Sequence, residues 1–540
     1  MSTTPEHHTE TVRQSISTNV MVTMVARVVY LITRFFVPPF VLARMSMEAY
    51  GLWATAFILV SYIGISTTGL SSVYSKYVAE YSARGEHNRA NSLLSTGLIL
   101  TTPLCMALFG VVYLFWPWCM RYLKITPGLA TEARVVVLIV VGSFLLSLCT
   151  SAFSDALTGV QKEAANQWIW IAAYLFETTL IFVLVGIGHG VRGLAEAFLL
   201  RTLLEVVLSV IVAVREIRWL RISSTLISRE SIRTIFSFGG VVQIVSLFAI
   251  GLNSIERVLA APLIGLEASG LLDISKKLPG MAASIPNAFT NSLVPAASYL
   301  QGALEGAAEA RATLHKLFLK GARYMNLAAG YFCGFLAAAS WPALFVWLGK
   351  QYDGAPLLAS IFAVATQVHL MTGPGTSVLK GVGRPREEFY YCIPNILALA
   401  VFVPLSRLVL GTWTALGIGT AVAMSTVVSA VFFLRHANRI LDLPSRRYVK
   451  AVVLPGFVPY AVAVPLALPA IWAVSQVGRW TGAGIVVLLG SVYTAVLAAV
   501  VYRLVLEQGE RLWFRAVVAN HLPRIGRVRV GEARRSDVAV

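Results

Sequence analysis

Charged side chains are scarce in this chain, and acidic ones are the scarcest. Only 13% of the 540 residues are Asp, Glu, Lys or Arg, and 57% are hydrophobic. Soluble proteins carry about 25% charged residues. The mean hydropathy is +0.73. This composition excludes an ordinary soluble enzyme or binding module and indicates a protein of the lipid bilayer.

The sequence also lacks the residue patterns that commonly support catalysis or metal binding. Its five cysteines lie in or beside apolar segments without Cys-x-x-Cys spacing, and its eight histidines form no His-x-x-x-His pair. There is no Gly-x-Ser-x-Gly or Walker motif, and the lone Gly381-Val-Gly383 follows no predicted strand. We therefore predict a protein that is not an enzyme and has no cofactor or metal site.

Long apolar segments are abundant instead. Runs of about 18 or more mostly apolar residues predict about fourteen transmembrane helices, so the expected fold class is an all-α polytopic membrane protein. The predicted spans are 16–43, 47–74, 91–118, 131–158, 164–188, 193–216, 232–262, 268–298, 316–348, 355–379, 387–408, 413–437, 451–475 and 481–505. The predicted outward connections are short, which leaves no room for an external catalytic domain.

The net charge is +18, and the positions of the basic residues along the chain indicate the membrane topology. With a cytoplasmic N-terminus, roughly 30 of the basic residues fall in inner connections and about 8 outside, as the positive-inside rule requires. We therefore predict a multi-pass protein of the bacterial cytoplasmic (inner) membrane with both termini in the cytoplasm. The same distribution argues against nucleic acid as a partner.

A short internal repeat predicts two matched halves. Arg34-(x4)-Pro39 followed by Glu48-Ala-Tyr-Gly-Leu recurs, about 220 residues later, as Arg257-(x4)-Pro262 followed by Glu267-Ala-Ser-Gly-Leu. Six spans separate the copies, so both halves have the same orientation and a site is expected between them. The predicted organisation is an N-terminal segment 1–15, a first lobe 16–220, a second lobe 221–440, two extra helices in 441–505 and a basic tail 506–540.

Basic residues inside the predicted spans are the candidate substrate-binding groups. The first span is interrupted by Arg27 and Arg34, two helical turns apart, neither with a carboxylate three or four residues away. An arginine at membrane depth costs about 2.5–3.5 kcal/mol, so such groups normally face a polar cavity or a partner. We predict that Arg27, Arg34, Arg257 and Lys276 line a water-filled cavity that receives an anion. A structural partner from another helix, or an outer headgroup near Arg34 and Arg257, is the alternative.

Acidic residues inside the spans are the candidates for ion coupling. Glu177, Asp155 and Asp273 are predicted to couple transport to a proton or sodium gradient, with structural pairing as the alternative. Asp273 precedes Lys276 by three residues and Lys277 by four, so it is expected to neutralise one of them. That would leave one lysine, most simply Lys276, for the cavity.

Several segments resemble the polysaccharide-transport (Wzx-type) flippases of the multidrug/oligosaccharidyl-lipid/polysaccharide (MOP) exporter superfamily, which also includes the lipid II flippases. They are RFFVPPFVLAR (34–44), YGLW (50–53), GLSSVYSKYVAEY (69–81), GEHNRANSLLSTG (85–97) and LKGVGRPREEF (379–389). The resemblance implies two six-helix lobes in a V around a central cavity, plus two C-terminal helices. It also implies transport of an undecaprenyl-diphosphate-linked oligosaccharide from the inner to the outer leaflet for surface polysaccharide synthesis. Membrane lipids, a polysaccharide polymerase and other assembly proteins are the implied partners.

Other functions remain open from the sequence. A lipid II flippase or a MATE-type multidrug or cation antiporter would share the superfamily, although a cation antiporter favours acids in the cavity and usually twelve spans. A membrane glycan polymerase or ligase needs a sizeable outer loop, which the short connections do not provide. In a scaffolding protein, the unpaired charges buried in the membrane would cost free energy and serve no function.

Overall fold

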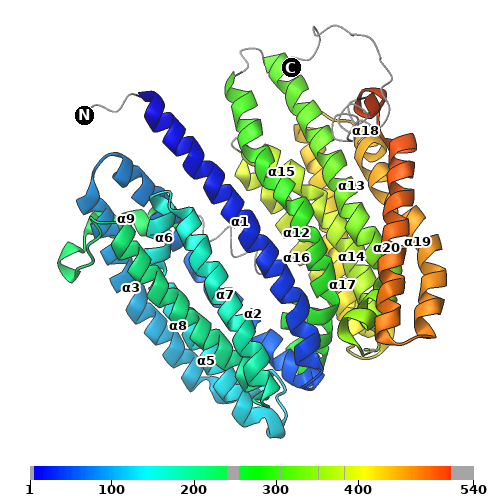
Figure 1. Cartoon of the computed structure of the whole chain (residues 1–540), viewed down its shortest axis with the longest axis horizontal. Helices are drawn as coiled ribbons and strands as arrows, with labels where there is room; N and C mark the ends of the chain where they lie inside the picture. The colour runs from blue at the N-terminus through cyan, green and yellow to red at the C-terminus, as the bar shows by residue number, and fades with distance from the viewer. Residues whose placement is uncertain (1–4, 240–253, 304–306, 351, 382–383, 513–540) are drawn as a thin grey trace, which may run out of the picture.

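The computed structural model describes residues 5–239, 254–303, 307–350, 352–381 and 384–512, and every element in these ranges is helical. The helices form two halves that meet at one end and diverge toward the end at which α1 begins (Figure 1). We refer to α1–α9 as the first half and to α11–α20 as the second half.

The first half contains the long helices of the first six predicted spans, several of them divided in two. Its α-helices are α1 (Pro5–Leu42), α2 (Met47–Ala83), α3 (His87–Leu114), α4 (Trp116–Tyr122), α5 (Ala130–Cys149), α6 (Ser151–Gly159), α7 (Glu163–Gly186), α8 (Gly190–Glu216) and α9 (Arg229–Thr234). Single turns of 3₁₀- or π-helix lie at Pro127–Leu129, Ser224–Leu226 and Ile235–Gly239.

The second half also consists of long helices, with two further long helices added at its C-terminal end. Its α-helices are α11 (Ile255–Leu263), α12 (Leu266–Ala303), α13 (Ala307–Leu348), α14 (Ala355–Leu370), α15 (Thr372–Gly381), α16 (Phe389–Leu410), α17 (Ala415–Ile440), α18 (Ser445–Tyr448), α19 (Leu454–Ser475) and α20 (Arg479–Val500). Short 3₁₀- or π-helical turns lie at Pro385–Glu388, Val449–Val453 and Val501–Val505. The two added helices, α19 and α20, pack together and against α13.

Eleven helices in the described residues are long and apolar enough to cross a membrane. They correspond to predicted spans one, three to six and nine to fourteen. The second predicted span corresponds to α2, whose apolar stretch is described only over Met47–Val60. The seventh lies partly in residues 240–253, outside the described structure, and the eighth lies in α12, which includes several charged residues. The fold class is confirmed, and the full number of fourteen spans stays a prediction.

Helix α1 continues through Pro38 and Pro39. Proline has no N–H, so Pro39 leaves the carbonyl of Phe35 without its helical donor. The indole Nε1 of Trp347 on α13 donates to that carbonyl over 2.7 Å, and the Phe35 and Trp347 rings stack with centroids 5.7 Å apart. Pro39 thus leaves a carbonyl that accepts a hydrogen bond from α13, and this bond connects α1 of the first half to the second half.

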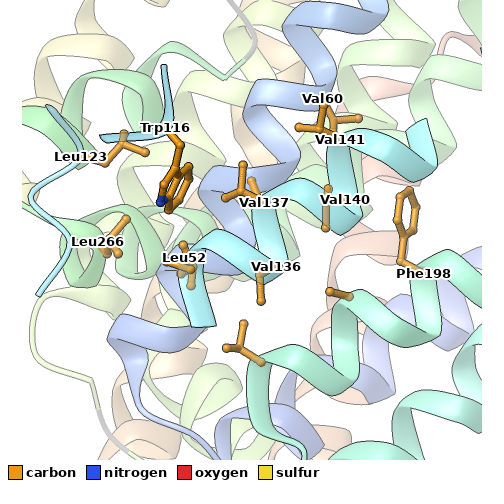
Figure 2. Packing of buried hydrophobic residues seen from close by; sticks show 14 of the residues in the cluster. Leu52, Val60, Trp116, Leu123, Val136, Val137, Val140, Val141, Phe198 and Leu266 are labelled. Atoms are coloured by element: carbon orange, nitrogen blue, oxygen red, sulfur yellow. The ribbon is translucent and has the colours of Figure 1, made fainter. Parts of the chain in front are cut away.

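The largest apolar cluster of the first half lies between α2, α5 and α8 (Figure 2). Leu52 and Val136 are fully buried in it, and Phe198 contributes a large ring. Leu266, the first residue of α12, also belongs to this cluster. The core of the first half therefore includes a residue of the second half, at the end where the two halves meet.

The two halves approach each other closely where the two copies of the repeat cross. A Cβ built on Gly51 of α2 would lie 1.8 Å from the carbonyl oxygen of Leu266, and one on Gly270 of α12 would lie 3.1 Å from the Cα of Gly51. Beside this contact, Thr55 Oγ1 lies 3.1 Å from Ser269 Oγ. Only glycine permits backbones to come so close, so the matching glycines of the repeat form the contact that closes this end.

Candidate functional site

Two arginines project from α1 beside aromatic rings of its own helix and of α7. Arg27 is exposed and Arg34 is half-buried. The guanidinium carbon of Arg34 lies 5.7 Å from the ring centroid of Tyr30 and 5.5 Å from that of Tyr174. In the described part of the chain, no carboxylate lies within salt-bridge distance of Arg27 or Arg34. Their charges are therefore not cancelled by a direct ion pair there.

Arg34 lies at the junction of the two halves. It lines a small pocket together with Tyr50 of α2 and Lys277 of α12. The pocket has a volume of about 20 Å³, which is enough for about one water molecule. Cationic groups from both halves therefore meet here around one small polar space.

Asp273 is the centre of the charged cluster on the second-half side of this junction. One carboxylate oxygen accepts a hydrogen bond from Arg257 over 2.6 Å, and the other accepts from Lys277 and from Tyr50, each over 2.7 Å. The Lys277 ammonium also lies 2.7 Å from the Tyr50 hydroxyl. Since Tyr50 belongs to the first half, this cluster links the two halves. The predicted pairing of Asp273 with a nearby lysine is confirmed for Lys277.

Lys276 has an acidic partner that the sequence did not indicate. Its ammonium lies 2.9 Å from Glu256 Oε1, and Arg257 Nε lies 3.9 Å from the same oxygen. Glu256 is fully buried. The expectation that Lys276 remains without a neutralising acid is therefore wrong, because α11 folds back on α12 and brings Glu256 against it.

The cluster as a whole retains positive charge. Three basic groups (Arg257, Lys276 and Lys277) share two carboxylates (Glu256 and Asp273), which leaves a formal charge of one positive unit. Arg34 adds a second positive charge beside Lys277. Such an arrangement suits a multivalent anion, which can bind through charge-assisted hydrogen bonds once it displaces or shares these carboxylates.

The two predicted coupling acids of the first half have different surroundings. Glu177 is buried, and its carboxylate lies 3.6 Å from Arg201, which also pairs with Glu205 at 3.0 Å. Asp155 accepts a hydrogen bond from Ser71 over 2.5 Å. Among the described residues, no basic group lies within salt-bridge distance of Asp155, and its second oxygen has no hydrogen-bond partner. Asp155 is therefore the better candidate for a carboxylate that takes up and releases a proton.

An apolar pocket of about 600 Å³ opens beside the charged junction. It lies between α1, α12, α13 and α20, with Phe35, Met281, Phe335 and Val487 among its lining residues. No local sequence pattern predicts this pocket, because its lining residues come from four separate helices. Two of its lining residues, Phe35 and Leu278, directly follow Arg34 and Lys277 in the chain.

Comparison with known proteins agrees with this fold. Residues 12–301 match the family of polysaccharide biosynthesis proteins. A Bacillus subtilis (strain 168) protein described as "Uncharacterized membrane protein EpsK" is 21% identical over 431 residues, which is 77% of this chain and 82% of that protein.

Two solved structures show the same fold at low sequence identity. The lipid II flippase MurJ, in an inward closed conformation, superposes with a TM-score of 0.68 at 10% identity over 90% of this chain and 98% of MurJ. An inward-facing multidrug resistance MATE transporter of the MOP superfamily gives 0.59 at 15% identity over 79% of this chain and 98% of that one. The predicted fold class and family are confirmed: the chain has the fold of these two transporter structures and belongs to the polysaccharide biosynthesis protein family.

Proposed function

We propose that this protein is a flippase that moves an undecaprenyl-diphosphate-linked oligosaccharide from the inner to the outer leaflet of the bacterial inner membrane. The observation that supports the proposal most strongly is the pair of arginines on α1 without a direct acidic partner, beside a second-half cluster that retains positive charge. A diphosphate cannot cross about 30 Å of hydrocarbon without groups that replace its hydration. Arg27 and Arg34 offer such groups on the helix between the two halves.

The apolar pocket supports a lipid-linked substrate. Its lining contributes Phe35 from the same helix that presents Arg34, so a hydrocarbon chain and a diphosphate can be held side by side. We propose that the part of the polyprenyl chain nearest the diphosphate lies along this pocket while the remainder stays in the bilayer. A water-soluble substrate would gain nothing from such a space.

The arrangement of the halves supports alternating access. If both termini are cytoplasmic, as the distribution of basic residues predicts, the end closed by Gly51 and Gly270 is the outer one. The state described here would then receive substrate from the inner leaflet. Rocking of the two halves about the charged junction would open the outer end and close the inner one.

The functions of other proteins with this fold are the alternatives. A lipid II flippase, the function stated for MurJ, would use the same site for a diphosphate and differ in the attached sugar. A cation antiporter of the MATE type would need an acid available to an organic cation. The carboxylates of Glu177, Glu256 and Asp273 each lie within 4 Å of a basic group, which favours the anionic substrate.

Removal of either α1 arginine tests the proposed function. Arg27→Ala and Arg34→Ala should each lower the rate of flipping about tenfold or more at low substrate concentration. A charge-assisted hydrogen bond contributes about 1.5–3 kcal/mol, and each 1.4 kcal/mol is a factor of ten. The rate is measured in proteoliposomes that hold a synthetic undecaprenyl-diphosphate glycan, by the fraction accessible to an external glycosidase over time.

Arg44→Ala is the matched control for these variants. Arg44 lies two residues after the end of α1, is exposed, and donates to the carbonyl of Phe40 at the helix end. Its loss should leave the flipping rate and the protein level unchanged. Wild-type rates in both Arg27→Ala and Arg34→Ala would refute the assignment of α1 as the diphosphate-binding helix.

Ion coupling is tested at Asp155. If this carboxylate exchanges protons during the cycle, Asp155→Asn should abolish the acceleration of flipping by an imposed pH gradient and leave the rate without a gradient nearly unchanged. Glu205→Gln, which removes an acid that is already paired with Arg201, serves as the control and should keep the response. A response in Asp155→Asn equal to that of the wild type, or a wild type insensitive to both proton and sodium gradients, contradicts this role.

A further inference from the structure

The connection between α8 and α9 joins the sixth predicted span to the seventh, and five arginines gather at it. Their side chains are all exposed, and we call them the basic surface: Arg215, Arg218, Arg221, Arg229 and Arg233. Helix α9 packs against α3, on the side of the first half that faces away from the second half (Figure 1). The basic surface therefore lies apart from the charged junction, and the proposed diphosphate site does not account for it.

The positive charge of the basic surface is not compensated by acidic side chains. The two glutamates of this region already have other partners, because Glu216 lies 3.1 Å from Lys162 and Glu230 lies 3.7 Å from Arg89. In the ranges of the chain that the structure describes, no carboxylate lies within salt-bridge distance of the five arginines. Arg89 on the neighbouring α3 differs from them, since it also pairs with Glu86 at 2.9 Å. The basic surface thus offers charge that a bound anion can neutralise.

Side chains of α3 hold the backbone of the connection in place. Asn91 donates from Nδ2 to the carbonyl of Trp219 over 2.8 Å, and its Oδ1 accepts from the Arg221 N–H over 3.0 Å. Thr96 Oγ1 accepts from the Ser228 N–H over 3.2 Å. Asn91 and Thr96 are both buried. A topology signal requires only basic residues on the inner side of the membrane. A fixed backbone does more, because it lowers the conformational entropy that the arginines lose when they bind an anion.

The place of the connection in the membrane indicates which anion it meets. With the predicted cytoplasmic termini, α8 ends at the inner surface of the bilayer, and α9 leads into the next predicted span. Clusters of about 4–8 basic residues directly after a membrane span on this side attract anionic lipid headgroups. Ile227 and Phe236, on either side of α9, are 45% and 65% exposed. Apolar side chains beside arginines suit the boundary between headgroups and acyl chains, whereas a soluble anion would gain nothing from them.

We propose that the basic surface binds the phosphate groups of anionic phospholipids in the inner leaflet, with Ile227 and Phe236 in contact with their acyl chains. Arginine suits this role because its planar guanidinium donates two hydrogen bonds to one phosphate. The bound lipids would hold the inner end of the first half at the bilayer surface. This proposal does not depend on which substrate the protein transports.

Two short-chain phospholipids that differ in headgroup charge test the proposal. Dioctanoyl phosphatidylglycerol is anionic and dioctanoyl phosphatidylcholine has no net charge. Native mass spectrometry of the full-length protein, released from neutral detergent micelles, gives the dissociation constant of each lipid. Since each basic residue near a headgroup contributes about fivefold in affinity, the wild type should bind phosphatidylglycerol at least about tenfold more tightly than phosphatidylcholine.

Removal of two arginines assigns this preference to the basic surface. The double variant with Arg218→Gln and Arg221→Gln should bind phosphatidylglycerol about 25-fold more weakly and phosphatidylcholine as before. The matched control carries Arg121→Gln and Arg134→Gln. These two arginines are also exposed residues of the first half, in α4 and α5, and they flank the predicted outward connection between the third and fourth spans. The control loses the same charge and should keep the affinity of the wild type for phosphatidylglycerol.

A third variant keeps all five arginines and releases the backbone that carries them. Asn91→Ala removes both hydrogen bonds to the connection and should weaken the binding of phosphatidylglycerol about fivefold. Thr96→Val removes only the bond to Ser228 and should act in the same direction if Asn91→Ala does not fold. An attraction that depends on net charge alone would be unchanged in both variants.

Four results would overturn the proposal. Equal affinity of the wild type for the two lipids refutes a site for anionic headgroups. Equal losses in the double variant and its matched control show attraction by net charge instead of a defined surface. Full affinity for phosphatidylglycerol in Thr96→Val, and in Asn91→Ala where it folds, contradicts the fixed arrangement. Displacement of phosphatidylglycerol by an equal concentration of inorganic phosphate would identify the surface as a site for soluble anions.

Discussion

Replacement of Gly51 by alanine is expected to force the two halves apart at the closed end. The added Cβ would lie 1.8 Å from the carbonyl oxygen of Leu266, a backbone atom that no side-chain rotation can move. Overpacking costs about 1–3 kcal/mol, which shifts a two-state equilibrium about 5–150-fold. A cysteine pair at Thr55 and Ser269, built without the native cysteines, reports the contact, and its disulfide yield should fall strongly in Gly51→Ala.

Gly110→Ala is the control for this substitution. Gly110 lies in α3, and a Cβ built there meets no atom within 4 Å. Alanine should be tolerated and should favour the helix slightly. The cross-linking yield must remain that of the parent protein. Equal yields in Gly51→Ala and Gly110→Ala would show that the glycine contact does not hold the outer end closed.

The fold was largely predictable from the sequence because membrane-length apolar runs directly specify helices. The runs at 164–188 and 193–216 match α7 (Glu163–Gly186) and α8 (Gly190–Glu216) within a few residues. The least predictable span was 268–298, since α12 combines an apolar face with several charges. Asp273 and Lys276 pair with Arg257 and Glu256 of α11, and a hydropathy pattern along one chain segment does not contain this information.

The candidate site was predictable only in its local part. The Asp273–Lys277 pair follows from helical spacing, because residues four apart lie on one face. The Lys276–Glu256 pair joins two helices, and the Tyr50–Asp273 hydrogen bond joins the two halves. Neither of these two contacts follows from a local sequence pattern. The repeat aligns Gly51 with Gly270, the residue of α12 that it adjoins, but it aligns Tyr50 with Ser269 rather than with its partner Asp273.

Replacement of Asp273 by asparagine is expected to have the largest effect on stability. Asp273 is the shared carboxylate of Arg257 and Lys277, and both basic side chains are mostly buried. Removal of one partner from a buried ion pair costs about 3–5 kcal/mol, because it leaves a charge without compensation. Asp273→Asn should therefore lower the Tm of the protein in nanodiscs and weaken the link from Tyr50 to the second half. Differential scanning fluorimetry measures the shift.

Inorganic diphosphate distinguishes a functional cluster from a purely structural one. Asp273→Asn leaves the cluster with a formal charge of two positive units, and these charges are more accessible to an anion. Millimolar diphosphate should therefore raise the Tm of this variant by more than it raises the Tm of the wild type. Asp353→Asn, at an exposed position before α14, should change neither the Tm nor the response to diphosphate. If diphosphate fails to stabilise Asp273→Asn, the anion of the transport cycle does not replace Asp273 as the partner of Arg257 and Lys277.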